Sequence, residues 1–128
     1  MSHEGKRKIL FVCSGNMNRS PTAEQVFKKL LSQHGYKVFG NDSVVDFDIE
    51  VNSAGLEAVE GGNQLTQEML ERHSEIYVFE PWHQEVLIAE YNLPKEKIVC
   101  LNIPDIYEKD DPELKALLRS KLLDYVRV

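Results

Sequence analysis

Hydrophobic residues gather in four short runs that are separated by longer, mixed segments. The runs lie at residues 8–13, 48–53, 75–79 and 97–101. Three of them, at 9–12, 76–79 and 98–101, are continuously apolar, which is typical of parallel strands that are covered on both faces. The pattern therefore predicts four β-strands in a sheet that lies between helices.

Helical periodicity fills the intervals between the runs. From residue 23 to residue 31, apolar side chains recur at i, i+3, i+4, i+7 and i+8, and Gly35 then breaks the stripe. N-caps at Thr66 and Asp111 predict two further helices, the second with Pro112 at its first helical position. In all, helices are expected over residues 23 to about 35, 66–72, 82–91 and 111 to about 125.

Strands that alternate with helices predict a doubly wound α/β fold, a three-layer sandwich with a four-stranded parallel sheet. Ligands of such sheets bind at the carboxyl ends of the strands. With 128 residues and no low-complexity tract, the chain is expected to form a single domain over residues 1–128. Residues 35–47 fit none of the predicted elements.

Composition narrows the classes of function. The chain is 42% hydrophobic and 28% charged, and its apolar run after the polar N-terminus is too short for a signal peptide or a membrane span. We therefore expect a cytoplasmic protein without a membrane partner. The net charge is −6, and the basic residues are scattered except for Lys6, Arg7 and Lys8, which are expected to form a solvated tail. Nucleic acid is thus not an expected partner.

The segment between the first predicted strand and the first predicted helix carries the candidate chemistry. It reads Cys-Ser-Gly-Asn-Met-Asn-Arg-Ser-Pro from Cys13 to Pro21. A loop at a helix N-terminus aims successive backbone N–H groups at one point, where they bind an anion together with the positive end of the helix dipole. Gly15 allows the backbone to turn, and Asn16 tolerates a left-handed conformation. The sequence therefore predicts a phosphate-binding loop.

Cys13 and Arg19 stand six positions apart in this loop. If the loop curls around one phosphate, the thiol lies below the phosphorus and the guanidinium fork grips two of its oxygens. The cationic surroundings favour the thiolate, which is the nucleophilic form of cysteine. Ser20 is expected either to donate a hydrogen bond to the sulfur or to cap the helix. Cys100 lies within a predicted strand and is expected in the core, so the two cysteines indicate neither a disulfide nor a zinc site.

The stretch from Leu10 to Glu24, Leu-Phe-Val-Cys-Ser-Gly-Asn-Met-Asn-Arg-Ser-Pro-Thr-Ala-Glu, resembles the signature of the low-molecular-weight protein tyrosine phosphatase family. The resemblance continues weakly through residues 52–55 and 103–105, in a chain that is shorter than a typical member. It implies hydrolysis of a phosphoester, with protein phosphotyrosine expected first, through a phosphocysteine on Cys13. It implies no cofactor and no metal ion.

The resemblance also assigns roles to individual residues. A carboxylic acid must protonate the leaving oxygen, and in the family this is an aspartate of an Asp-Pro pair after the last strand. Asp111 has the literal pair but is better explained as a helix start, so Asp105 is favoured, with Ile106 in place of proline. Tyr107 matches an aromatic residue that stacks on an aryl substrate. The expected catalytic residues are Cys13, Arg19 and Asp105, and the expected substrate-binding residues are Ser14, Gly15, Asn16, Met17, Asn18, Ser20 and Tyr107.

Other features depart from the family or lie outside the predicted site. Asn18 stands where many members have a second loop cysteine, and the loop over residues 56–65 is shortened, so the substrate walls differ. The histidines show no metal-binding spacing and none is assigned to the site. The segment from Glu80 to His83 is expected to be a helix start with a packed tryptophan, Trp82.

Two other functions fit the same loop. One is arsenate reduction, for which Cys100 is the available second cysteine, although its place in a strand argues against this role. The other is a non-catalytic module that binds phosphorylated ligands. A dinucleotide-binding domain is disfavoured because no Gly-X-Gly-X-X-Gly follows the first strand. The expected oligomeric state is a monomer or a weak dimer.

Overall fold

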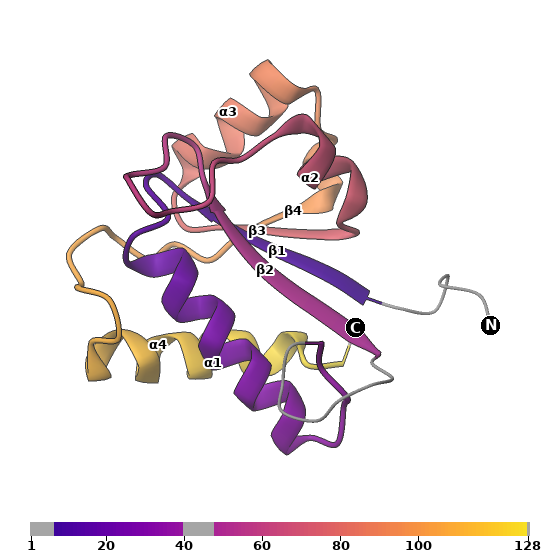
Figure 1. Ribbon diagram of the computed structural model, residues 1–128, viewed down its shortest axis with the longest axis vertical. Coiled ribbons are helices and arrows are strands. Elements are labelled where there is room, and N and C mark those ends of the chain that lie inside the picture. Colours follow the sequence, from indigo (N-terminus) through magenta and orange to yellow (C-terminus); the bar gives the residue numbers. More distant parts are fainter. Residues whose placement is uncertain (1–6, 40–47, 128) are drawn as a thin grey trace.

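A parallel sheet with helices on both faces forms the centre of the protein (Figure 1). The computed structural model describes residues 7–39 and 48–127. The strands are β1 (Arg7–Cys13), β2 (Ile49–Gly55), β3 (Glu75–Val78) and β4 (Ile98–Cys100), in the spatial order β2-β1-β3-β4. The four-stranded parallel sheet of a doubly wound α/β fold is therefore confirmed.

The helices also follow the sequence pattern. They are α1 (Arg19–Gln33), α2 (Gln67–Arg72), α3 (Pro81–Tyr91) and α4 (Pro112–Leu122), with short 3-10 turns η2 (Lys95–Lys97) and η3 (Leu123–Tyr125). Both expected N-caps are present: Thr66 Oγ1 accepts the N–H of Met69, and Asp111 Oδ1 accepts the N–H of Glu113. Helix α1 begins at Arg19, before the apolar stripe, and the polar side chains of Arg19, Ser20 and Thr22 at its start are buried.

Alternate residues of β1 serve two separate cores. Ile9 and Phe11 pack with α1 and α4 on one face of the sheet. Leu10 and Val12 pack with α2 and α3 on the other face. Figure 1 shows the same division, with α1 beside α4 below the sheet and α2 and α3 above it. The loop that follows β1 therefore starts from an internal strand that is covered on both faces.

Arg7 corrects the expectation of a solvated basic tail. Its guanidinium donates to both carboxylate oxygens of Glu75, at 2.7 and 2.8 Å, and to the carbonyl oxygens of Tyr125 and Val126. Arg7 therefore ties β1 to β3 and to the C-terminal turn, whereas Lys6 lies outside the described residues. Because Arg7 stands between two lysines in the sequence, its pattern did not indicate this structural role.

The unplaced segment 35–47 is described only as far as residue 39. Val38 is buried and forms an isolated parallel bridge with Ile49, so the chain adds a short extension beside β2. Cys100 is only half-buried, and its thiol donates to Asn102 Oδ1 at 3.4 Å. The expectation that Cys100 belongs to the core therefore holds only in part, because β4 is an edge strand.

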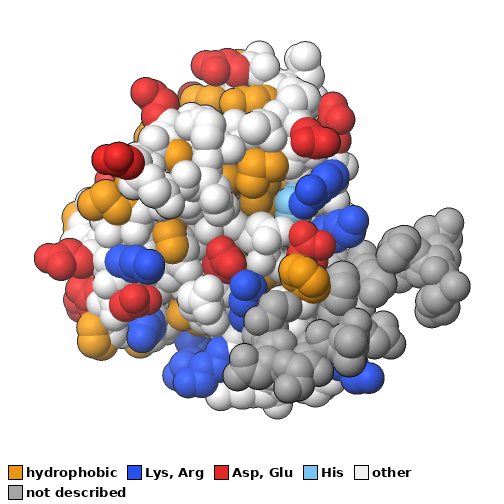
Figure 2. Space-filling view, in the orientation of Figure 1, with side chains coloured by type: hydrophobic (Ala, Val, Ile, Leu, Met, Phe, Trp, Pro, Cys, Tyr) orange, Lys and Arg blue, Asp and Glu red, His pale blue; other side chains and the backbone are white. Residues whose placement is uncertain are grey.

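The surface offers no strong field of one sign on the face seen in Figure 2, where acidic and basic side chains are interspersed. No helix of the described residues is long and apolar enough to cross a bilayer.

The cap of α4 can be tested by stability. Replacing Asp111 with alanine removes the acceptor for the N–H of Glu113 and is expected to lower the free energy of unfolding by about 1 kcal/mol. Urea denaturation measures this change. Glu108→Ala is the control, because it removes an exposed carboxylate from the same loop without removing a cap. An equal loss in both variants would contradict the cap assignment.

Candidate active site

The backbone of the loop after β1 is held from outside by the segment that follows β2. The three bonds join Leu56 N to Cys13 O at 2.9 Å, Glu57 N to Ser14 O at 2.8 Å and Val59 N to Gly15 O at 3.0 Å. In a trans peptide the C=O and the next N–H point in opposite directions, and none of the described peptides is cis. Turning these carbonyls outward therefore directs the N–H groups of the loop toward its centre, as an anion site requires.

Asn16 fixes the curve of the loop. Its φ is 52°, so the left-handed position falls on Asn16 and not on Gly15. Its Oδ1 accepts the N–H of Asn63, and its Nδ2 donates to Ser20 Oγ, each at 2.8 Å. Gly55 passes directly beneath it, because a Cβ added at Gly55 would lie 2.6 Å from Asn16 N. Glycine is therefore the residue that lets β2 approach the loop this closely.

Cys13 ends β1 with its sulfur at the centre of the loop. Its Sγ lies 3.0 Å from Ser20 Oγ, which also lies 3.3 Å from the carbonyl oxygen of Ala54. Ser20 Oγ accepts from Asn16 and has one proton of its own, which it donates either to the carbonyl oxygen of Ala54 or to the sulfur when Cys13 is a thiolate. Asn18, and not Ser20, occupies the N-cap position of α1. Of the two roles expected for Ser20, the structure thus places it against the sulfur.

Arg19 is buried, with 1% of its side chain exposed, although it carries a charge. Its Nη1 donates to Glu80 Oε2 and to the carbonyl oxygen of Ile103, each at 2.7 Å. Its Nη2 donates to Ser14 Oγ at 3.3 Å, and its Nε lies 3.8 Å from Asp105 Oδ1. One end of the guanidinium is therefore anchored, and the Nε–Nη2 edge, with longer contacts, is the edge available for a bidentate anion.

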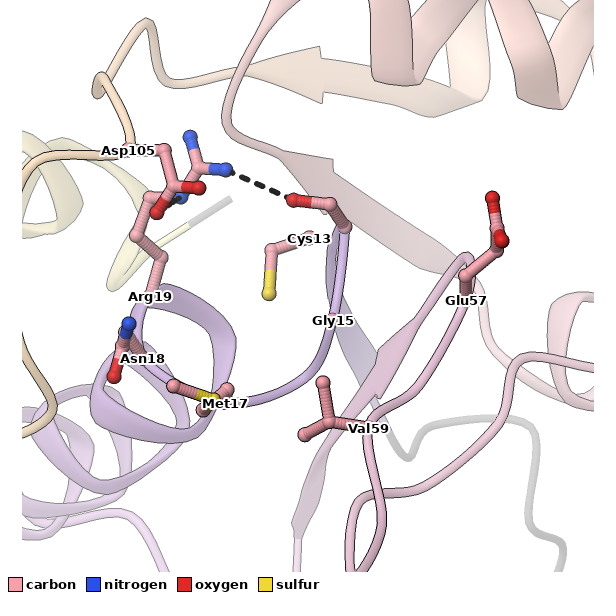
Figure 3. Close-up of a pocket in the computed structure, with 9 residues that line it drawn as sticks. Cys13, Gly15, Met17, Asn18, Arg19, Glu57, Val59 and Asp105 are labelled. Atoms are coloured by element: carbon pink, nitrogen blue, oxygen red, sulfur yellow. Dashed lines mark hydrogen bonds and ion pairs between the residues drawn. The ribbon is translucent and has the colours of Figure 1, made fainter.

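These groups surround a pocket of about 360 Å³. Figure 3 shows the sulfur of Cys13 pointing into it, with Arg19 and Asp105 on one side and Val59 on another. Its volume is within the range of small-ligand sites. The lining residues are Cys13, Ser14, Gly15, Met17, Asn18, Arg19, Glu57, Val59 and Asp105.

Several expected site residues lie elsewhere. Asn16 and Ser20 support the loop from below and do not line the pocket. Tyr107 is half-buried against the core formed with α1 and α4, and it is not among the lining residues. Asp111 is engaged as the cap of α4, whereas Asp105 stands at the pocket with 58% of its side chain exposed. The structure therefore places Asp105, and not Asp111, in the pocket that contains the sulfur of Cys13.

The sequence pattern did not indicate the role of the segment after β3. Its helix start is confirmed. The expectation of a packed tryptophan holds in part, because Trp82 is 45% exposed but the centre of its ring lies 4.4 Å from that of the buried ring of His83. Glu80 supplies the carboxylate that pairs with Arg19. The sequence did contain a sign of this role. Glu80 follows a strand that neighbours β1, and the carboxyl ends of such strands form the edge where ligands bind. Glu57 and Val59, from the shortened loop, were missed as pocket residues as well.

His83 is neutral near pH 7. Burial, followed by the nearby charge of Arg19, lowers the pKa of its imidazole to about 4. Its Nδ1 accepts the N–H groups of Phe79 and Glu80, each at 3.2 Å. Within residues 7–39 and 48–127, no group of three or more His, Cys, Asp or Glu side chains is arranged to hold a metal ion.

The fold and the loop define a class of protein: an α/β fold in which a Cys-X5-Arg loop joins the first strand to the N-terminus of the first helix. The profile of the family described as "Low molecular weight phosphotyrosine protein phosphatase" matches residues 8–78, which is more than half of the 128-residue chain. The chain belongs to this family and is a phosphatase-family hydrolase.

The proteins similar in sequence are named after two different substrates, phosphoarginine and phosphotyrosine. The chain is 26% identical over 139 residues to a protein-arginine-phosphatase of Bacillus subtilis, with 88% of this chain and 92% of the relative covered. It is 38% identical over 63 residues to the low molecular weight phosphotyrosine protein phosphatase of Mus musculus. That second match covers 49% of this chain and 34% of the mouse enzyme.

Solved structures share the fold over nearly the whole chain. An arginine phosphatase mutant with a phosphorylated active-site serine has a TM-score of 0.71 at 21% identity, covering 94% of this chain and 95% of its own. The tyrosine phosphatase Wzb from Escherichia coli K30, in complex with phosphate, has a TM-score of 0.70 at 21% identity, covering 94% and 96%.

The close approach beneath the loop gives a direct test. In Gly55→Ala, the new Cβ meets Asn16 N at 2.6 Å, so the loop must shift. We expect the kcat/KM of the folded protein for an aryl phosphate to fall about a hundredfold, since displacement of reacting groups by about 1 Å has that effect. Gly35→Ala is the control: its φ of 91° strains the end of α1, far from the pocket, so stability falls while kcat/KM stays. Unchanged activity in Gly55→Ala would contradict the account of the loop.

Proposed function

We propose that the protein hydrolyses phosphate monoesters of protein side chains, phosphotyrosine above all, through a phosphocysteine on Cys13. The observation that carries the proposal is the shared pocket of one thiol, one guanidinium edge and one carboxyl group: Cys13, Arg19 and Asp105. Family membership supports the same reaction class.

In the first step, the thiolate of Cys13 attacks phosphorus. The phosphate oxygens lie among the N–H groups of the loop and on the Nε–Nη2 edge of Arg19, which balance the charge that spreads over them. A P–S bond forms as the ester P–O bond breaks. Asp105, as the neutral acid, gives its proton to the departing oxygen, which leaves as an alcohol or phenol.

In the second step, water removes the phosphoryl group from sulfur. Asp105, now a carboxylate, takes a proton from the water as its oxygen attacks phosphorus, and the P–S bond breaks. The products are inorganic phosphate and the thiolate of Cys13. A hydrogen bond from Ser20 Oγ, 3.0 Å from the sulfur, stabilises that thiolate as the leaving group.

Steady-state hydrolysis of an aryl phosphate tests these roles. Cys13→Ser is expected to abolish turnover, because the nucleophile is lost. Asp105→Asn is expected to lower kcat by about 10²- to 10⁴-fold, the usual contribution of a general acid. Asp111→Asn is the matched control and is expected to retain activity, since Asp111 caps α4. If Asp111→Asn loses activity and Asp105→Asn retains it, the acid has been assigned to the wrong residue.

The walls of the pocket favour an aryl ester. Met17 and Val59 are both exposed and apolar and line the entrance, where a phenyl ring gains contact area. Phosphoarginine is the second candidate. The relative from Bacillus subtilis bears that substrate in its name, and the carboxylates of Glu57 and Asp105 stand around the pocket to meet a phosphorylated guanidinium.

Two peptides of identical sequence separate these substrates, one with phosphotyrosine and one with phosphoarginine. The phosphotyrosine peptide is expected to have the higher kcat/KM. Met17→Ser is expected to reduce it about tenfold, the value of a small apolar contact in a pocket. The inhibition constant of inorganic phosphate, which touches no apolar wall, should stay the same. A higher kcat/KM for the phosphoarginine peptide would show that the substrate assignment is wrong, but it would not contradict the assignment as a phosphatase.

Arsenate reduction would need a disulfide between Cys13 and Cys100, and the register of the strands disfavours this pairing. Cys100 pairs with Val78, and Val78 pairs with Val12, so Cys100 lies two strand spacings from the end of β1. That separation is about 10 Å, whereas the Cα atoms of a disulfide lie within about 7 Å. A disulfide between Cys13 and Cys100 would need movement of the sheet. A protein that binds phosphate but hydrolyses no phosphoester would instead be the non-catalytic module.

A further inference from the structure

His83 has one ring nitrogen that is satisfied and one that is not. Its side chain is fully buried, with 0% exposed. Two backbone N–H groups, of Phe79 and Glu80, donate to Nδ1. Nδ1 therefore offers a lone pair, and the proton of the neutral ring is on Nε2. In the described part of the chain, Nε2 is a buried polar atom without a hydrogen-bond partner.

The nearest acceptor for that proton belongs to the active-site ion pair. His83 Nε2 lies 3.9 Å from Glu80 Oε2, and the same oxygen accepts from Arg19 Nη1 at 2.7 Å. The gap is too long for a hydrogen bond, but a small rotation of the carboxylate, or one bridging water, closes it. Buried donors are rarely left unpaired, so this contact is the expected use of the Nε2 proton.

We propose that His83 is a positioning residue of the phosphatase reaction: its Nε2–H holds the carboxylate of Glu80, which in turn holds Arg19 with its free edge toward the phosphate. This inference rests on the proposed function. Glu80 is 29% exposed, and its side chain also belongs to the capping box of α3 with the backbone N–H of residue 83. Without the His83 ring, the carboxylate loses a buried side chain that lies beside it together with Arg19. Arg19 then keeps the carbonyl of Ile103 as its remaining anchor at Nη1.

The charges around His83 fit a neutral donor. The charged groups near its ring are Arg19 from α1, Glu80 at the start of α3 and Asp105 from the loop after β4. A cationic ring would compete with Arg19 for Glu80 and repel the guanidinium. Burial keeps the ring neutral, and a neutral donor supports Glu80 without taking it from Arg19.

Two amide substitutions distinguish the roles of the two ring nitrogens of His83. His83→Asn keeps a short acceptor for the backbone N–H groups and removes the distal donor. His83→Gln reaches the position of Nε2 with an amide donor and removes the short acceptor. If His83 positions Arg19, the folded fraction of His83→Asn has a kcat/KM about 10- to 100-fold lower than wild type and a higher inhibition constant of phosphate. His83→Gln then loses stability and keeps the kcat/KM of its folded fraction within about threefold.

A second buried histidine provides the control. His73 bonds to Asn52 and to the carbonyl of Met69, near α2 and outside the pocket. His73→Gln is expected to lower stability without changing kcat/KM or phosphate inhibition. It shows what the loss of a purely structural histidine does to this protein.

The opposite order of the His83 variants overturns the proposal. If His83→Asn keeps full kcat/KM and phosphate affinity, the Nε2 proton has no role in positioning Arg19, and His83 acts only on the helix start. Calorimetric binding of inorganic phosphate to the same variants keeps this test independent of turnover. If the wild-type protein binds phosphate and hydrolyses nothing, the proposed function fails, while the affinities of the variants still decide the role of His83.

Discussion

The buried guanidinium of Arg19 is the constraint on which the site depends. A charge with 1% of its side chain exposed must be paired, because an unpaired buried charge would be far too costly. Its partners come from three separate parts of the chain: Ser14 in the loop, Glu80 after β3, and Ile103 with Asp105 after β4. Satisfying one side chain therefore gathers the carboxyl ends of three strands around the sulfur of Cys13. The same contacts leave one edge of the guanidinium for an anion, so pairing and function do not compete.

The loop around the phosphate site is rigid for a complementary reason. Its carbonyls are bonded outward to the segment after β2, and Asn16 closes the curve through Asn63 and Ser20. The strand order β2-β1-β3-β4 places β1 between the two strands whose ends support the loop and Arg19. The donors are thus oriented before a ligand arrives, which is the condition under which such sites stabilise developing charge most effectively.

Local patterns in the sequence were sufficient for the fold class and for the position of the loop after the first strand. The four short apolar runs and the helical periodicity between them, with caps at Thr66 and Asp111, predicted all eight main elements. The segment from Cys13 to Arg19 predicted the loop. What could not be read locally depends on distant contacts. Glu80 meets Arg19 across 61 positions, and Arg7 meets the C-terminal turn across more than a hundred. Tyr107 was placed by family likeness, but the structure packs it against the core.

The proposed reaction passes through a phosphocysteine on Cys13, and this intermediate can be trapped. Wild-type enzyme is mixed with a phosphotyrosine peptide, denatured within milliseconds and digested, and the fragment that contains Cys13 is weighed by mass spectrometry. At early times, this fragment is expected to carry one added phosphoryl group, attached to sulfur. Hydrolysis of the peptide with no phosphoryl group on Cys13, or with the group on another residue, would contradict the account.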